Sequence, residues 1–113
     1  MPFPVENIRH HALVTTVPQD LRIAIFAQLQ ALVRGDLPEL LTWVQQYKGI
    51  GTALVTQPME IWTHRDTEVT PTRDGGWHVV VPLWTSDESP SDLSAEVTVA
   101  PDGRARITSV HVL

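Results

Sequence analysis

Histidines are the side chains of this sequence with the clearest capacity for metal binding. The chain has five of them, at His10, His11, His64, His78 and His111. No two have the four-residue spacing that places a pair of metal ligands on one helix face, and no glutamate completes such a zinc motif. His78 and His111 could meet across a sheet, but a metal site there would need a third ligand. We therefore predict no metal site and no cofactor.

Acid–base catalysis is the other chemistry that His78 could support. A hairpin would bring it near Asp66 or Glu68, and a histidine beside a carboxylate can act as a general base. The same pairing is also common as an inert surface contact. The sequence contains no Gly-x-Ser-x-Gly, no phosphate-binding loop and no Gly-x-Gly-x-x-Gly motif. We therefore predict no catalytic residues and favour a protein that is not an enzyme.

Aromatic and acidic side chains suggest two further kinds of site. A pocket could be lined by aromatic or imidazole side chains, although tryptophans often simply fill a core. The pocket candidates are Trp62, Trp77, His78, Trp84 and His111. A loop near the end of the chain gathers carboxylates that could bind a basic protein partner, with a solvated turn as the alternative. The partner-binding candidates are Asp87, Glu88 and Asp92.

Two helices are predicted in the first half of the chain. The first covers residues 18–34, because apolar side chains recur there at helical spacing. Its main stripe is Leu21, Ile25, Leu29, Leu32 and Val33, and a second stripe on the far side is Ile23, Ala24, Ala27 and Ala31. The small residues of the second stripe would let a helix or a partner subunit approach closely. Gly35 suits the left-handed end of this helix, and Asp36 is expected to cap a second helix running to Tyr47.

Antiparallel strands are predicted in the second half. Residues 77–84 are rich in β-branched and aromatic residues and largely apolar on both faces, and Pro82 places the end of the strand at a sheet edge or a bulge. Residues 93–100 alternate, with inward positions at Leu93, Ala95, Val97 and Val99. The last strand changes parity, so either a bulge lies near Thr108 or its end is buried on both faces. Weaker strands are predicted at 52–56 and 68–72, and a helical turn at 58–62 would point Met59 and Trp62 the same way.

Composition sets outer bounds on the protein. Its 113 residues suit a single domain, 1–113, in which residues 1–15 receive no secondary-structure assignment. A net charge of −5 argues against nucleic-acid binding and leaves a basic protein partner open. No apolar run reaches the roughly 20 residues of a membrane span, and the first residues do not resemble a secretory signal. The absence of cysteine excludes disulfides. These features are typical of a cytoplasmic, bacterial-type protein.

Two short motifs resemble a known superfamily. The segment Ala31-Leu32-Val33-Arg34-Gly35-Asp36-Leu37-Pro38-Glu39-Leu40 resembles the helix junction of the nuclear transport factor 2-like (SnoaL-like, cystatin-like) superfamily, and Ala100-Pro101-Asp102-Gly103-Arg104 is similar to the turn before its last strand. The resemblance implies an α+β fold, in which N-terminal helices pack on a curved antiparallel sheet of about four to five strands. That cystatin-like cone would hold a pocket. Residues 83–93 and the ending 111–113 also resemble small bacterial domains of unknown function, which offer no catalytic residues to transfer.

Three functions remain as hypotheses. The first is a non-enzymatic binding or interaction module, homodimeric, with a small apolar ligand in its pocket. The second is an immunity-type protein that neutralises a basic toxin through the acidic loop. The third is a small-molecule isomerase or cyclase. The superfamily's isomerases place an acidic base after the second helix, and the matching residues 47–51 contain no Asp or Glu, which argues against the third.

Overall fold

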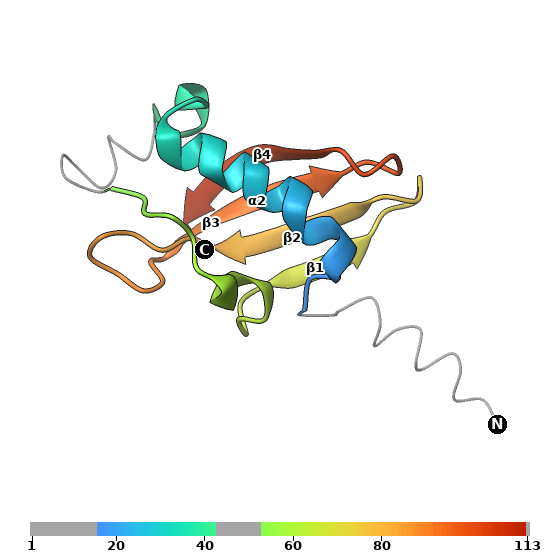
Figure 1. Ribbon diagram of the computed structural model, residues 1–113, viewed down its shortest axis with the longest axis horizontal. Helices are drawn as coiled ribbons and strands as arrows, with labels where there is room; N and C mark the ends of the chain where they lie inside the picture. Colours follow the sequence, from blue (N-terminus) through green and yellow to red (C-terminus); the bar gives the residue numbers. More distant parts are fainter. Residues whose placement is uncertain (1–15, 43–52, 113) are drawn as a thin grey trace.

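A helix packed on a four-stranded antiparallel sheet forms the small α+β fold of this protein (Figure 1). The computed structural model describes residues 16–42 and 53–112. The helical elements are α2 (Gln19–Arg34) and two 3₁₀ helices, η1 (Pro38–Leu40) and η2 (Met59–Trp62). The strands are β1 (Glu68–Pro71), β2 (Trp77–Pro82), β3 (Leu93–Val99) and β4 (Ala105–Val112). No helix within these ranges combines the length and apolarity needed to cross a membrane.

The main apolar stripe predicted for α2 is confirmed as the buried face of this helix. Four of the five stripe residues are buried against the sheet, and the fifth, Val33, is half-buried. The helix ends as predicted at Gly35, whose φ of 87° is the left-handed conformation that glycine adopts without a steric penalty. On the opposite side Ile23 is 84% exposed. Helix α2 therefore presents one apolar surface to the core and leaves another uncovered by the described residues.

The prediction that an α-helix begins after an Asp36 cap is wrong. Residues 38–40 form the short 3₁₀ helix η1, and no side chain caps it. The Asp36 carboxylate instead accepts a hydrogen bond from the Arg34 guanidinium, with Nη2 and Oδ2 2.9 Å apart. A local ion pair thus replaces the expected cap. The part of that predicted helix from residue 43 onward, together with residues 1–15 and the histidines His10 and His11, lies outside the described residues.

The sheet is a meander in the order β1-β2-β3-β4, with every neighbouring pair antiparallel. The predicted turn at Asp74-Gly75-Gly76 joins β1 to β2, and Gly75 has a φ of 92°. Of the expected strand at 52–56, the structure describes residues 53–56, which form an isolated bridge between Leu54 and Thr85. β1 begins at Glu68, opposite Val80, so Pro82 lies beyond β1 and pairs with β3 alone, at Ser94. The next residue, Leu83, donates its N–H to Leu93 beyond Ser94, so the backbone nitrogen of Pro82 faces the open β1 side, where no N–H is needed.

A bulge interrupts the pairing of β3 with β4 and confirms one of the two predicted alternatives. Val97 pairs with Ile107 and Glu96 pairs with Ser109, so Thr108 has no partner position in β3. The bulge accommodates this extra residue, so Ile107 and Val110, which have opposite parity in the sequence, both face the core. The Thr108 hydroxyl donates a hydrogen bond to the Glu96 carbonyl oxygen, at 3.2 Å.

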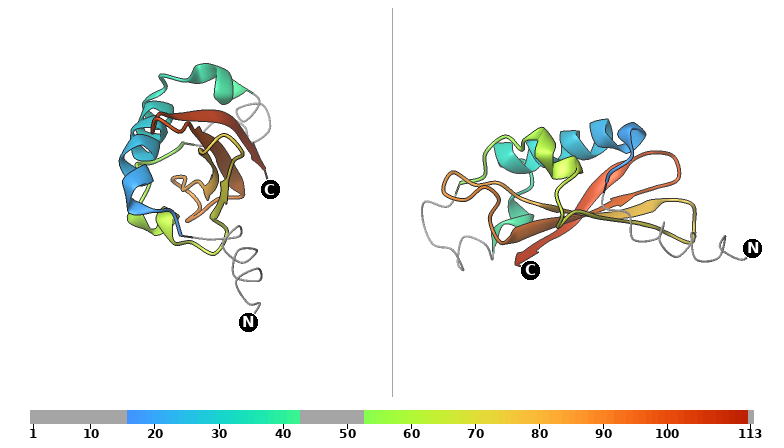
Figure 2. Two further views of the ribbon diagram at one scale, coloured as in Figure 1. Left: turned by 90° about the vertical axis from the view of Figure 1, so that its right-hand side faces the viewer. Right: turned by 90° about the horizontal axis from the view of Figure 1, so that it is seen from below.

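The hydrophobic core lies between α2 and the inner face of the curved sheet (Figure 2). The predicted inward positions of β3 are buried there, with Val97 at 0% exposure. Both faces of residues 77–84 are apolar in sequence, and the structure turns inward the face that carries Val79, Val81 and Leu83, each at 0% exposure. Ile25 and Leu29 of α2 also have 0% exposure, and Val69 of β1 has 1%. Aliphatic side chains from the helix and all four strands therefore fill the layer in which a conical pocket was expected.

Candidate functional site

An apolar groove lies on the outer side of the fold, between α2 and η2. Both helical elements lie on the same face of the sheet (Figure 2). The groove has a volume of about 500 Å³. Its lining residues are Gln19, Arg22, Ile23, Phe26, Pro58, Met59 and Trp62. A concave, mostly apolar surface with a few polar groups is the usual character of a small-molecule site.

Two protruding side chains form the rim of the groove. Ile23 on α2 is 84% exposed and Met59 on η2 is 77% exposed. Single exposed apolar side chains are common on protein surfaces, whereas a patch beside a concavity more often marks a binding surface. The neighbouring Trp62 is 5% exposed and Phe26 is half-buried. The groove therefore has an aromatic inner surface and an aliphatic rim.

Hydrogen bonds tie the two walls of the groove together. The Val17 amide, just before α2, donates to the Trp62 carbonyl oxygen of η2 at 2.9 Å. The Arg22 Nε–H in turn donates to the Val17 carbonyl oxygen, also at 2.9 Å. The Arg22 guanidinium carbon lies 5.9 Å from the centroid of the Trp62 ring, within the range of a cation–π contact. These contacts fix the groove before any ligand enters.

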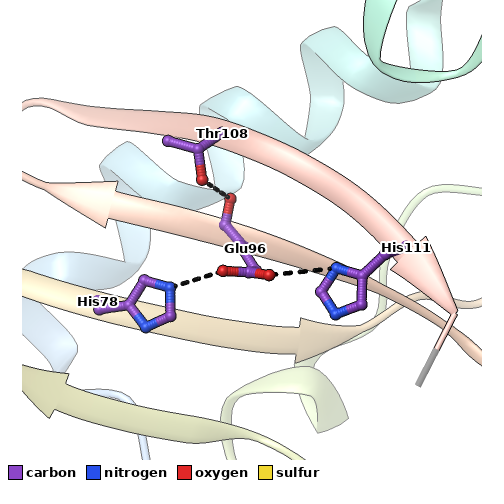
Figure 3. Close-up of polar contacts among 4 residues, drawn as sticks. All are labelled: His78, Glu96, Thr108 and His111. Atoms are coloured by element: carbon purple, nitrogen blue, oxygen red, sulfur yellow. Dashed lines mark hydrogen bonds and ion pairs between the residues drawn. The ribbon is translucent and has the colours of Figure 1, made fainter.

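A second cluster of functional side chains lies on the opposite face of the sheet, where Glu96 stands between His78 and His111 (Figure 3). His78 Nε2 is 2.9 Å from Glu96 Oε1, and His111 Nδ1 is 3.3 Å from Glu96 Oε2. The three side chains are 33–40% exposed. Each carboxylate oxygen thus faces one imidazole, and the arrangement is a partly solvated polar network on the sheet surface.

The register of the strands keeps these two histidines apart. His78 lies opposite Thr98, whereas His111 lies opposite Ser94, four residues away along β3. Two strand spacings and four residues correspond to a Cα separation of roughly 16 Å. Within residues 16–42 and 53–112, no three His, Asp or Glu side chains are placed to hold a metal ion.

The predicted pairing of His78 with Asp66 or Glu68 is not formed. Glu68 lies opposite Val80 in the β1–β2 register, and Thr70 is the residue opposite His78. Asp66 instead lies beside His64, where Oδ2 and Nδ1 are 3.8 Å apart. The carboxylate that reaches His78 comes from β3, on the other side of β2.

The structure separates the five pocket candidates. Trp62 lines the groove, and His78 and His111 lie on the other face of the sheet. Trp77 and Trp84 are half-buried and pack against the core. The Trp84 ring meets His64 edge to face, with centroids 5.7 Å apart. Trp62 is therefore the predicted pocket residue that contributes to the groove.

The acidic candidates lie in the loop between β2 and β3. Asp87, Glu88 and Asp92 are all exposed. The loop has an internal framework, because the Thr85 hydroxyl accepts a hydrogen bond from the Glu88 amide at 3.1 Å. The buried Ser91 hydroxyl donates to the Leu83 carbonyl oxygen at 2.7 Å. The carboxylates therefore project from a loop that is held at both ends.

Sequence reasoning missed Arg22 and Phe26 in the groove and Glu96 in the histidine cluster. The shared direction of Met59 and Trp62 was predicted, and both line the groove. The outward position of Ile23 was also predicted from helical spacing. What local spacing did not reveal is that η2 folds back beside the first turns of α2, a contact between segments about forty residues apart in the chain.

Comparisons with known proteins give a family without an assigned activity. No curated protein and no solved structure matches the chain. One family model matches residues 19–113, which include every helix and strand of the described fold. The chain therefore belongs to the family described as a domain of unknown function, DUF7668.

Proposed function

We propose that this protein is a non-enzymatic binding module that holds a small apolar ligand in the groove between α2 and η2. The observation that carries the proposal is the groove itself, a concavity of about 500 Å³ whose walls and rim are predominantly apolar. That volume lies within the range of small-molecule sites in proteins, roughly 300–1,000 Å³. Covering Ile23, Met59 and the inner aromatic rings would remove apolar surface from water, which favours binding.

Preorganisation supports a small ligand at this place. The hydrogen bonds from Val17 to Trp62 and from Arg22 to Val17 hold the two walls at a fixed spacing. A ligand that enters a fixed groove does not have to order its walls, and this lowers the entropic cost of binding. Self-association through the same rim is the main competing occupant, because a second copy could also cover Ile23 and Met59.

The filled core argues against the isomerase or cyclase alternative. In the superfamily that the sequence resembles, the expected substrate site lies within the cone between helix and sheet. Here Leu29, Val81 and Val97 occupy that layer at 0% exposure. The curved sheet beside a long helix supports the cystatin-like comparison at the level of architecture, while the groove on the outer side of α2 is the better candidate for a ligand.

Binding of an uncharged apolar fluorophore tests the proposal. N-phenyl-1-naphthylamine should bind the purified protein saturably, with one probe per chain, and its fluorescence should rise. The variants Ile23→Asp and Met59→Asp place a charge in the rim and should weaken binding at least about tenfold, since desolvating a charged group is costly. Because both residues are exposed, the melting temperature should change little.

Val55→Asp is the matched control for these variants. Val55 is another exposed apolar residue, and it does not line the groove. This variant should bind the probe as the unmodified protein does. Equal binding by all four proteins, or no saturable binding, would refute the proposal. Sedimentation equilibrium provides the second control: a dimer that dissociates in Ile23→Asp would assign the groove to a second copy and refute the small-ligand proposal.

A further inference from the structure

We propose that the ligand of this groove is an apolar carboxylic acid whose carboxylate is bound by Arg22. The inference rests on the proposed function and adds the chemical class of the ligand. Arg22 is the charged residue among those that line the groove in the described part of the chain. Its place beside apolar walls gives the groove one cationic end, which complements a molecule with an apolar body and an anionic head.

The guanidinium of Arg22 is held in place by contacts that leave most of its donors free. Its Nε–H donates a hydrogen bond to the Val17 carbonyl oxygen, and its central carbon, Cζ, lies 5.9 Å from the Trp62 ring centroid. Among residues 16–42 and 53–112, no carboxylate forms an ion pair with Arg22. The four N–H bonds on its terminal nitrogens therefore remain for a ligand.

A carboxylate is the ligand group that best fits this geometry. The planar guanidinium binds a carboxylate through parallel N–H···O bonds, and such charge-assisted bonds are about twice as strong as neutral ones. Arg22 is half-buried, so water screens the interaction less than it would on a fully exposed side chain. The stack on Trp62 holds the guanidinium in place, which reduces the rotamer entropy lost on binding.

The net charge of the chain makes a preference for anions informative. At −5 the protein as a whole repels anions weakly over long range. Non-specific attraction would therefore favour a cationic amphiphile over an anionic one. A preference for the anion must come from a local cation, and in the groove that cation is Arg22.

Competition among three ligands with the same alkyl chain tests the inference. Decanoate, 1-decanol and decylamine, each below its micellar range, are titrated against the protein loaded with N-phenyl-1-naphthylamine. Decanoate should displace the probe at about tenfold lower concentration than decanol, as expected for a hydrogen-bonded charge pair. Its advantage should shrink as sodium chloride is raised, because salt screens a partly exposed pair.

Variants of two arginines test whether Arg22 causes the preference for decanoate over decanol. Arg22→Gln should reduce the advantage of decanoate over decanol to less than about twofold, and Arg22→Lys should retain part of it, since lysine keeps the charge without the planar fork. Arg106→Gln is the matched control, because Arg106 is exposed on β4 outside the groove, and this variant should keep the full advantage.

The outcomes separate the two proposals. If decanol or decylamine displaces the probe as well as decanoate from the unmodified protein, the carboxylate inference is wrong while the apolar groove stands. If Arg22→Gln keeps the preference, another group binds the anion and the role of Arg22 is refuted. If neither the probe nor any of the three ligands binds, the proposed function fails as well. The comparison on the unmodified protein does not depend on the folding of any variant.

Discussion

Asp74 shows how a single turn residue can acquire an electrostatic role. Its pKa is lowered from the ordinary value of 3.8, first by the hydrogen bond from the Thr72 hydroxyl and next by that from the Gly76 amide. Both donors favour the ionised carboxylate. The carboxylate of Asp74 has a lower pKa in the folded state than in the unfolded chain. Ionised Asp74 therefore stabilises the fold at pH values above the pKa that it has in the unfolded chain. This contribution disappears as the pH falls through the folded pKa.

Replacing this carboxylate should therefore have an effect that depends on pH. We predict that Asp74→Asn lowers the urea midpoint at pH 7 and that the difference from the unmodified protein shrinks as the pH falls well below 3.8. Thr72→Val should remove most of the same pH dependence, because its hydroxyl is the largest cause of the shift. Urea titrations at a series of pH values check both. A deficit of equal size at pH 7 and in strong acid would show that the charge of Asp74 is not its origin.

The contacts that Glu96 makes with His78 and His111 are partly exposed to solvent. Their side chains are 33–40% exposed, and exposed ion pairs typically contribute about 0–1 kcal/mol. The cluster thus adds little to stability, and its carboxylate orients two imidazoles on the outer face of the sheet. The groove and this cluster occupy opposite faces, so changes in one can be made without touching the other.

Among the elements, β4 contains a bulge that accommodates one additional residue, Thr108. Ile107 on one side of the bulge and Val110 on the other both reach the core. Without that extra residue, the five remaining positions from Ile107 to Val112 would alternate regularly, with the same three apolar residues facing inward. The bulge therefore changes the curvature and twist of the strand, while the identity of the buried residues does not require it.

This property predicts different outcomes for two single-residue deletions. Deleting Thr108 should leave a folded protein that is less stable by about 1 kcal/mol, mainly through loss of its hydrogen bond to Glu96. Deleting Val110 should cost about 3 kcal/mol or more, because it removes a buried side chain and directs His111 toward the core. Chemical denaturation followed by circular dichroism measures both. Equal destabilisation by the two deletions would mean that the bent shape of β4 is itself required.

The two apolar surfaces of α2 explain how one element serves both the core and the groove. The stripe containing Leu21, Ile25 and Leu29 is buried under the sheet. Ile23 and Phe26, on another side of the same helix, line the groove. An exposed isoleucine is neutral for stability but provides apolar contact area to a ligand, which is why changes at Ile23 should affect binding and not folding.

At the scale of the whole molecule, a continuous core joins the helix to every strand. In the part of the chain that the structure describes, the buried apolar residues of α2, η2 and β1–β4 form one cluster. A domain of this size whose elements share one such cluster is expected to unfold in one cooperative step. Neither the helix nor the sheet has a separate core that would keep it folded alone.

Cooperativity should be visible in the response to a change in the helix. Leu29→Ala, at 0% exposure, should cost about 2–5 kcal/mol and shift the midpoints of far-ultraviolet circular dichroism and tryptophan fluorescence by equal amounts. Ile23→Ala, at 84% exposure, should change stability by no more than about 0.5 kcal/mol. Thermal or urea unfolding with both probes checks the prediction. Transitions that separate between the two probes would contradict a single core.

The sequence by itself determined the features that depend on local spacing. The apolar stripe of α2, the inward positions of β3 and the parity change near Thr108 follow from periods of 3.6 or 2 residues. The end of α2 at Gly35 follows from the left-handed conformation that glycine adopts. The α+β class and the hairpin order could be read from the same periods. The second helix was not read correctly at its start, because the Asp36 carboxylate has two local partners available and the Arg34 pair prevailed over a cap.

Only the tertiary structure decided which residues form a site. Glu96 lies between His78 and His111 because the register of three strands aligns them, and register is fixed by non-local pairing across the sheet. The groove exists because η2 returns to the first turns of α2, where Trp62 meets Arg22. The buried side chains between α2 and the sheet likewise come from elements that are far apart in the chain. Each of these outcomes depends on contacts between residues far apart in the chain, which local periodicity does not encode.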